Sequence, residues 1–196
     1  MNLKKLFFTF TILFGLSTNA QNEFKLGVKA GVNYSGFNVN GASTYTNGFG
    51  FLGGLIGEYK LSEKISLQPE LIFSQKTGAR GIPGIPAGIR SDLSYIDIPL
   101  NGKYYIFDGF AVEFGPQFDF LINDETTTEF YTSNHNEYPT DIETKPIQIS
   151  LNIGLSYKII DKYLLQFRYS HGLSNIFENI DAKNSVFAFS LGYYFL

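Results

Sequence analysis

A histidine and a serine stand close together in the segment His171-Gly-Leu-Ser174-Asn175, and an acidic side chain follows at Glu178. A histidine base beside a serine hydroxyl activates the serine as a nucleophile, and a carboxylate can orient the histidine. The base must lie within hydrogen-bonding reach of its nucleophile. Residues three apart in a strand point to opposite faces, so these two meet only if the chain bulges or loops at Gly172. We therefore predict that the protein is not an enzyme and assign no catalytic residue, and an enzyme using His171 and Ser174 is the alternative.

A second candidate site is the acidic stretch at residues 123–144, which contains no Lys or Arg. Carboxylate oxygens are the ligands that Ca²⁺ prefers, but the stretch lacks the regular spacing and the glycine of known calcium loops. We therefore predict a solvated external loop, no metal site and no cofactor. Its aromatic residues could contact a partner protein, because exposed aromatic residues mark interfaces. The acidic residues are Asp124, Glu125, Glu129, Glu137, Asp141 and Glu143, and the aromatic residues are Phe130, Tyr131 and Tyr138.

Elsewhere, charged and polar side chains alternate with apolar ones. In residues 95–107, apolar side chains at 96, 98, 100, 104 and 106 oppose Tyr95, Asp97, Asn101 and Lys103. Alternation with a period of two marks a β-strand that has one apolar and one polar face. The pattern predicts strands at residues 24–34, 49–61, 64–76, 95–107, 110–122, 146–157, 163–172 and 185–196.

The connections between these strands alternate in length. Long segments at residues 35–48, 77–92, 123–144 and 173–184 alternate with short turns at 62–63, 108–109 and 160–162. An even number of strands with short periplasmic turns and long external loops is typical of outer-membrane barrels. We therefore predict an all-β fold, an eight-stranded antiparallel up-and-down transmembrane β-barrel whose apolar face meets lipid. A soluble lipocalin-like binding barrel is the alternative, but the polar interior argues against it.

The polar faces of the predicted strands carry charges of both signs. Enclosed charges must be partnered, and eight strands leave an interior about wide enough for side chains to fill. We therefore expect a paired network that plugs the barrel, and a narrow pore or ion path is the alternative. The predicted interior set is Glu58, Glu70, Asp97, Glu113 and Asp119 with Lys25, Lys29, Lys60, Lys64, Lys103 and Arg168.

The first twenty residues have the pattern of a secretory signal peptide. Lys4 and Lys5 precede an apolar run at residues 6–16, and a polar close ends at Ala20. The run is far shorter than the ~20 residues of a membrane-spanning helix. We predict a cleaved signal peptide at residues 1–20, a barrel domain at residues 21–196 and a place in the cell outer membrane. The chain has no Cys and a net charge of −3, which leaves nothing basic enough to bind nucleic acid.

Several segments of the chain resemble the PorT-like outer-membrane beta-barrel family. They are Leu26-Gly-Val-Lys-Ala-Gly-Val-Asn33, Tyr95-Ile-Asp-Ile-Pro-Leu100, Lys103-Tyr-Tyr105, Gly115-Pro-Gln117, Arg168-Tyr-Ser-His-Gly-Leu-Ser-Asn175 and Leu191-Gly-Tyr-Tyr-Phe195. The resemblance covers the chain after residue 20 and implies the barrel fold and the outer membrane. Some members of that family are similar to secretion-system accessory proteins, but the resemblance implies no activity.

The segment at His171 is also similar to the His-x-Ser-Asn motif of outer-membrane lipid A deacylases. In those enzymes the His and the Ser are two residues apart, whereas here they are three apart. We therefore predict a structural, surface-interaction or envelope-complex accessory role that acts through the external loops. Its partners would be outer-membrane lipid and envelope or secretion-complex proteins. The alternatives are a lipid A-modifying barrel enzyme using His171 and Ser174, or a narrow pore.

Overall fold

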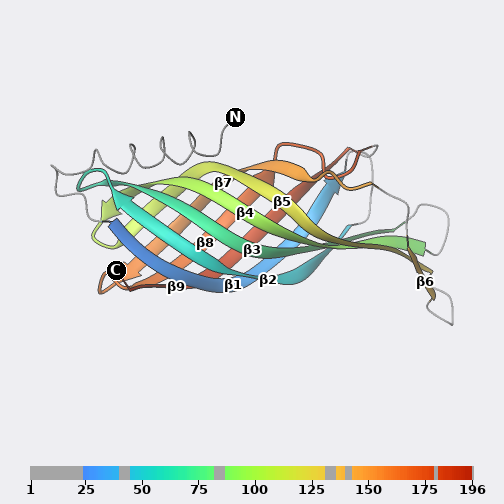
Figure 1. Cartoon of the computed structure of the whole chain (residues 1–196), viewed down its shortest axis with the longest axis horizontal. Helices are drawn as coiled ribbons and strands as arrows, with labels where there is room; N and C mark the ends of the chain where they lie inside the picture. The colour runs from blue at the N-terminus through green and yellow to red at the C-terminus, as the bar shows by residue number, and fades with distance from the viewer. Residues whose placement is uncertain are drawn as a thin grey trace, which may run out of the picture.

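The computed structural model describes residues 24–39, 45–81, 87–130, 136–139, 143–178 and 181–195. These residues form nine β-strands (Figure 1). They are β1 (Phe24–Val39), β2 (Tyr45–Lys60), β3 (Ile65–Gly81), β4 (Ala87–Phe107), β5 (Phe110–Phe130), β6 (Asn136–Pro139), β7 (Ile147–Ile159), β8 (Tyr163–Gly172) and β9 (Ala182–Tyr194). In the described part of the chain, no helix is long and apolar enough to cross a membrane. The proposed signal peptide lies outside the described residues and stays a prediction.

Eight of the strands close into an antiparallel up-and-down barrel, as the sequence predicts. Their order is β4-β3-β2-β1-β9-β8-β7-β5, and β4 also pairs with β5 to complete the ring. The ninth strand, β6, lies outside the ring. It pairs with Thr127 to Phe130 of β5, farther along the same edge that β7 covers from Phe110 to Phe120.

The two faces of the barrel wall differ as the alternation predicts. Phe114 and Ile153 point outward, with 58% and 60% of their surface exposed, whereas Glu113 and Asp119 point inward and are buried. Large apolar side chains in a soluble protein are mostly buried, so an exposed apolar band around a polar interior is the reverse arrangement. It is the arrangement of a barrel surrounded by lipid.

The three short turns lie at one end of the barrel, where β1 begins and β9 ends. Gly109 has a φ angle of +76° in the turn between β4 and β5, which an L side chain rarely adopts. In the turn between β7 and β8, Ile160 and Asp161 have φ angles of 52° and 58°. Two consecutive residues with positive φ fit the right-handed twist of the flanking strands. By the plan of outer-membrane barrels, this end faces the periplasm.

Most strands are longer than the sequence predicts, and most of the excess lies at the opposite end. Within the predicted loops at residues 77–92 and 123–144, residues 77–81, 87–92 and 123–130 are strand, because β3, β4 and β5 continue into them with regular pairing. The predicted loop at 35–48 is likewise partly strand, since β1 runs to Val39 and β2 starts at Tyr45. The predicted loop ends were wrong because polar and glycine residues here pair across strands without an apolar alternation to reveal them. In Figure 1, the ends of β4 and β5 run past the barrel to β6.

A charged residue on the outer face should weaken the fold. Phe114→Arg places a cation where the wall of the barrel meets lipid, and we expect it to lower the free energy of unfolding by ~2–4 kcal/mol. Urea unfolding in lipid vesicles measures this loss. Asn123→Arg, on an exposed residue of the outer extension, is the control and should change stability by less than ~0.5 kcal/mol. Equal losses at the two positions would contradict a lipid-facing Phe114.

Candidate functional site

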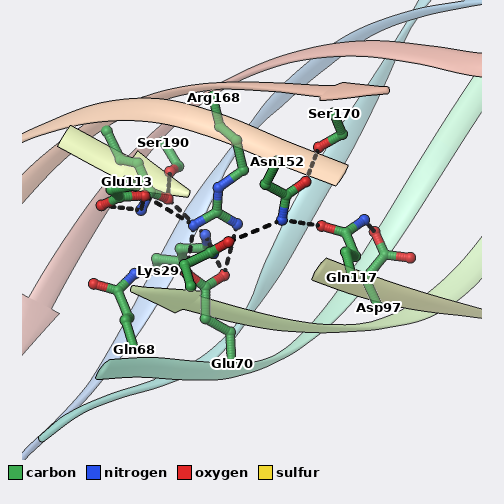
Figure 2. A network of polar contacts seen from close by, with 12 residues as sticks. Lys29, Gln68, Glu70, Asp97, Glu113, Gln117, Asn152, Arg168, Ser170 and Ser190 are labelled. Carbon is green, nitrogen blue, oxygen red and sulfur yellow. Dashed lines mark hydrogen bonds and ion pairs between the residues drawn. The ribbon is translucent and has the colours of Figure 1, made fainter. Parts of the chain in front are cut away.

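The centre of the barrel interior is organised around Arg168 of β8. Its guanidinium donates to Glu70 of β3 through Nη1 at 3.0 Å and Nη2 at 2.6 Å, and Nη2 also lies 3.2 Å from Glu113 Oε2 of β5. A guanidinium that binds a carboxylate through two parallel hydrogen bonds makes one of the stronger ion pairs in proteins. These three strands are not adjacent, so the contacts cross the interior from wall to wall (Figure 2).

Two lysines and a glutamine complete this central network. Lys29 Nζ lies 2.6 Å from Glu70 Oε2 and donates to Gln166 Oε1 at 2.7 Å. The Gln166 amide donates to both oxygens of Glu113, at 3.0 and 2.8 Å. Lys103 Nζ lies 3.5 Å from Glu113 Oε1. Each buried charge therefore has an opposite charge beside it.

A second cluster lies nearer the outer end. Asp97 and Asp119 are directly opposite each other on β4 and β5. Lys76 Nζ lies 3.2 Å from a carboxylate oxygen of each. Gln117 donates to both carboxylates, and Ser150 Oγ donates to Asp119 Oδ2 at 2.8 Å. The two aspartates thus share one ammonium group and one neutral donor, Gln117, and Asp119 has Ser150 as a further donor.

The sequence predicts most of these interior charges but not all. Glu58, Glu70, Asp97, Glu113 and Asp119 are buried, as are Lys29, Lys103 and Arg168. Lys25, Lys60 and Lys64 instead line the mouth of the barrel at the short-turn end. Lys76 and Lys158 were not predicted in the interior, although their side chains are only 2% and 8% exposed. Lys76 is the last residue of its predicted strand, and Lys158 follows directly after its own. Because Lys158 is two residues beyond Ser156, the alternation of that strand would have placed it on the inner face.

An apolar cluster closes the outer end of the interior. Ile176 and Phe177, which follow β8, pack with Phe37, Leu93, Tyr95 and Ala182. The backbone of this segment is held to the chain before β7, because Lys145 N donates to Ile176 O at 2.7 Å and Glu178 N to Glu143 O at 3.0 Å. Below the cluster, a cavity of about 30 Å³ lies between Lys76 and Arg168, which is room for about one water molecule. The geometry is that of a filled barrel.

The contacts of His171 and Ser174 give no support to the alternative of an enzyme that uses these two residues. His171 Nδ1 lies 3.3 Å from the Tyr169 hydroxyl, on the exposed face of β8. Ser174 Oγ accepts a hydrogen bond from the amide of Ile149 at 2.8 Å. Each side chain therefore has a different partner.

Within the acidic stretch, residues 123–130 form the outer part of β5 and residues 136–139 form β6. Asp124 and Glu125 are exposed on β5. Asp141 and His135 lie outside the described residues, as do the side chains of Glu129 and Glu137. Within the described part of the chain, no three His, Asp or Glu side chains gather as they would around a metal ion.

The fold and the sequence together place the chain in a family. A family model described as "Outer membrane protein beta-barrel domain" matches residues 19–178. The chain belongs to this family of outer-membrane β-barrels. Its place is therefore the cell outer membrane, where lipid surrounds the apolar wall. No curated protein matches the sequence significantly.

Solved structures show the same fold for this outer-membrane barrel. Ail, the attachment invasion locus protein of Yersinia pestis, in complex with the heparin analogue sucrose octasulfate, is 16% identical with a TM-score of 0.51. The alignment covers 88% of this chain and 99% of Ail. Ail without that ligand gives a TM-score of 0.50 at the same identity and coverage. At this identity the likeness shows the fold alone.

The central network predicts a strong coupling between Glu70 and Arg168. Glu70→Gln or Arg168→Gln leaves a buried charge without its partner, and each should cost ~3–5 kcal/mol of unfolding free energy. The double variant should cost less than the sum of the two by ~1–3 kcal/mol, because the second change removes the charge that the first one stranded. Urea unfolding of the four proteins measures this cycle. Additive losses would contradict a direct pair, and Glu125→Gln, on an exposed residue, is the control.

The filled interior also predicts that the barrel does not conduct ions. We expect the purified protein in planar bilayers to show no steady unit conductance, because side chains and the Ile176–Phe177 cluster occupy the path. Steady openings of the unaltered protein at moderate voltage would contradict this and favour the pore alternative. A variant with Glu70, Glu113 and Arg168 all replaced by Ala is the comparison, and it should leak if the barrel still assembles.

Proposed function

We propose that this outer-membrane barrel is a surface-interaction protein that engages its partner through a sheet projecting from its outer end. The supporting observation is the length of β4 and β5, which have 21 residues each. A strand of ~9–11 residues is enough to cross the membrane. Pairing between the two strands continues without a break from Ser94 and Asn123 out to Ala87 and Phe130. About half of each strand therefore lies beyond the membrane.

The projecting sheet is broader than a hairpin. β3 pairs with β4 as far as Gly81 and Gly88, and β2 pairs with β3 at Tyr45 and Arg80. On the other side, β6 pairs with the end of β5 and is the last strand in the order. A strand at the edge of a sheet offers unpaired N–H and C=O groups, to which an extended partner segment can add.

The chemistry of this sheet favours a basic partner. Asp124 and Glu125 are exposed, and no Lys or Arg occurs in residues 123–144. Opposite charges across an interface steer association and select partners.

Partial burial alone would raise the pKa of Asp92, which lies where the projecting sheet leaves the barrel. Hydrogen bonds from Arg90 Nε at 2.8 Å and Thr77 Oγ1 at 2.6 Å outweigh it and hold this pKa below its ordinary value.

The nature of the partner follows from the resemblance to the PorT-like family. Some members of that family are similar to secretion-system accessory proteins, so we propose a protein of the envelope or of a secretion complex as the partner. The filled interior supports this role over transport, because it leaves the surface of the barrel to carry the function. The contacts of His171 and Ser174 likewise give no support to lipid A modification.

The test shortens the sheet and leaves the barrel intact. A variant without residues 87–91 and 126–130 removes residues that pair with each other, so the register of Asp92 with Glu125 is kept. We expect crosslinking on intact cells, followed by purification, to recover the partner with the unaltered protein and at least tenfold less with the variant.

The control removes two charges at the other end of the barrel, with Glu63→Gln and Asp108→Asn, and should recover the partner in full. Urea unfolding checks that the shortened barrel still folds. Recovery of the same partner by the shortened variant would contradict the proposal.

A further inference from the structure

A lysine and two aspartates meet in the buried cluster near the outer end of the interior. Lys76 Nζ of β3 donates to Asp97 Oδ1 of β4 at 3.2 Å, and the same nitrogen lies 3.2 Å from Asp119 Oδ1 of β5. The three side chains are 2%, 7% and 0% exposed. The ring of Tyr95, which belongs to the apolar cluster above, lies 4.4 Å from Nζ. A primary amine is thus held against two carboxyl groups, away from water.

The two carboxyl groups differ in the hydrogen bonds that they accept. Asp97 and Asp119 pair directly across β4 and β5, and two carboxylates that share a site resist ionising together. Asp119 accepts hydrogen bonds from Gln117 at 2.6 Å and from Ser150 at 2.8 Å, whereas the Gln117 amide lies 3.2 Å from Asp97. Hydrogen-bond donors stabilise an anion. Asp119 is therefore the carboxylate of the pair, and Asp97 holds the proton as a carboxylic acid.

Lys29 and Lys103, which are also buried, face carboxyl groups of a different kind. Lys29 lies beside Glu70, which Arg168 holds through two parallel hydrogen bonds. Lys103 lies beside Glu113, which Arg168 also contacts. A guanidinium keeps both of these groups ionised, and an amine does not attack a carboxylate anion. Lys76 instead meets an acid and a base together.

We propose that Lys76 and Asp97 form an isopeptide bond inside the barrel. Asp119 takes a proton from the ammonium group of Lys76, and the neutral Nζ attacks Cγ of the Asp97 carboxylic acid. The hydroxyl group of Asp97 then leaves as water, so that one C–N bond forms and one C–O bond breaks. Of the protons of the ammonium group, one stays on the amide nitrogen, one leaves in the water molecule and one remains on Asp119. The reaction needs no oxidant and no further reactant.

The surroundings fit the products of this reaction. The cavity of about 30 Å³ is lined by Lys76, Asp97 and Gln117, among others, and it has room for about one water molecule, the one that is released. A neutral amide and a neutral Asp119 replace a buried ion pair, which removes the cost of keeping those charges out of water. The bond joins β3 to β4 directly below residues 77–81, where the projecting sheet leaves the barrel. It therefore ties together two of the strands that carry this sheet.

Peptide mapping of the protein purified from outer membranes tests the bond. Trypsin cuts after Lys and Arg, but it does not cut after a lysine whose amine is part of an amide. We expect residues 65–80 to stay joined to residues 91–103 in one product, which is lighter than the two peptides together by the mass of one water molecule. Recovery of residues 65–76 and 91–103 as separate peptides would overturn the proposal.

Variants assign the roles of the residues. Lys76→Arg keeps the positive charge but removes the amine, and it should abolish the joined product. Asp119→Asn keeps the shape of the side chain but removes the base, and it should lower the yield of the joined product about tenfold or more. Lys29→Arg, at another buried lysine beside a carboxylate, is the control and should leave the yield unchanged.

Two further results would count against this assignment. A loss of water that survives Lys76→Arg would overturn the proposal, and so would a bond from Lys76 to the peptide that carries Asp119 in place of Asp97. Urea unfolding checks that each variant folds, and the map of the unaltered protein decides the question if one of them does not.

Discussion

The ion pair between Arg168 and Glu70, with Glu113 beside it, is the constraint on which the barrel depends. The interior is buried, and moving an ion out of water costs several kcal/mol. That cost is offset only where an opposite charge and further hydrogen bonds are in place. Arg168 meets two carboxylates from strands that are not its neighbours. The pairing therefore fixes the cross-section of the barrel, and the same contacts that neutralise the charges also fill the space through which a solute would pass.

Alternation explains why so much of the wall could be predicted from the sequence. Each strand has lipid on one side and the polar interior on the other, so successive side chains meet these two environments alternately. The sequence assigned Ile98 to the lipid face and its neighbour Asp97 to the interior, together with Asp119, which pairs with Asp97 across β4 and β5. A shift by one residue would place aspartates in lipid. The charge pattern therefore sets the register as strongly as a hydrophobic core does in a soluble sheet.

The same reasoning explains why the predicted strands end too early on the outer side of the membrane. Beyond the membrane both faces of a strand meet water, so residues such as Thr126, Thr127 and Thr128 show no apolar alternation although they are paired in β5. Ile176 and Phe177 pack into the outer end of the interior from a segment that has no periodicity at all. Tertiary contact alone decides their place. His171 lies on β8 whereas Ser174 lies beyond its end, and the two side chains contact different partners, Tyr169 and the amide of Ile149.

A filled interior means that the two ends of the barrel act separately. Glu58 lines a cavity at the short-turn end of the barrel and lies 3.8 Å from Lys103, which in turn contacts Glu113. This chain of contacts reaches toward the outer end, but coupling between distant sites requires an element with two arrangements. A network of closely paired buried charges, stacked below an apolar cluster, offers one arrangement only. The packed interior therefore separates the short turns from the projecting sheet, and what meets one end does not alter what meets the other.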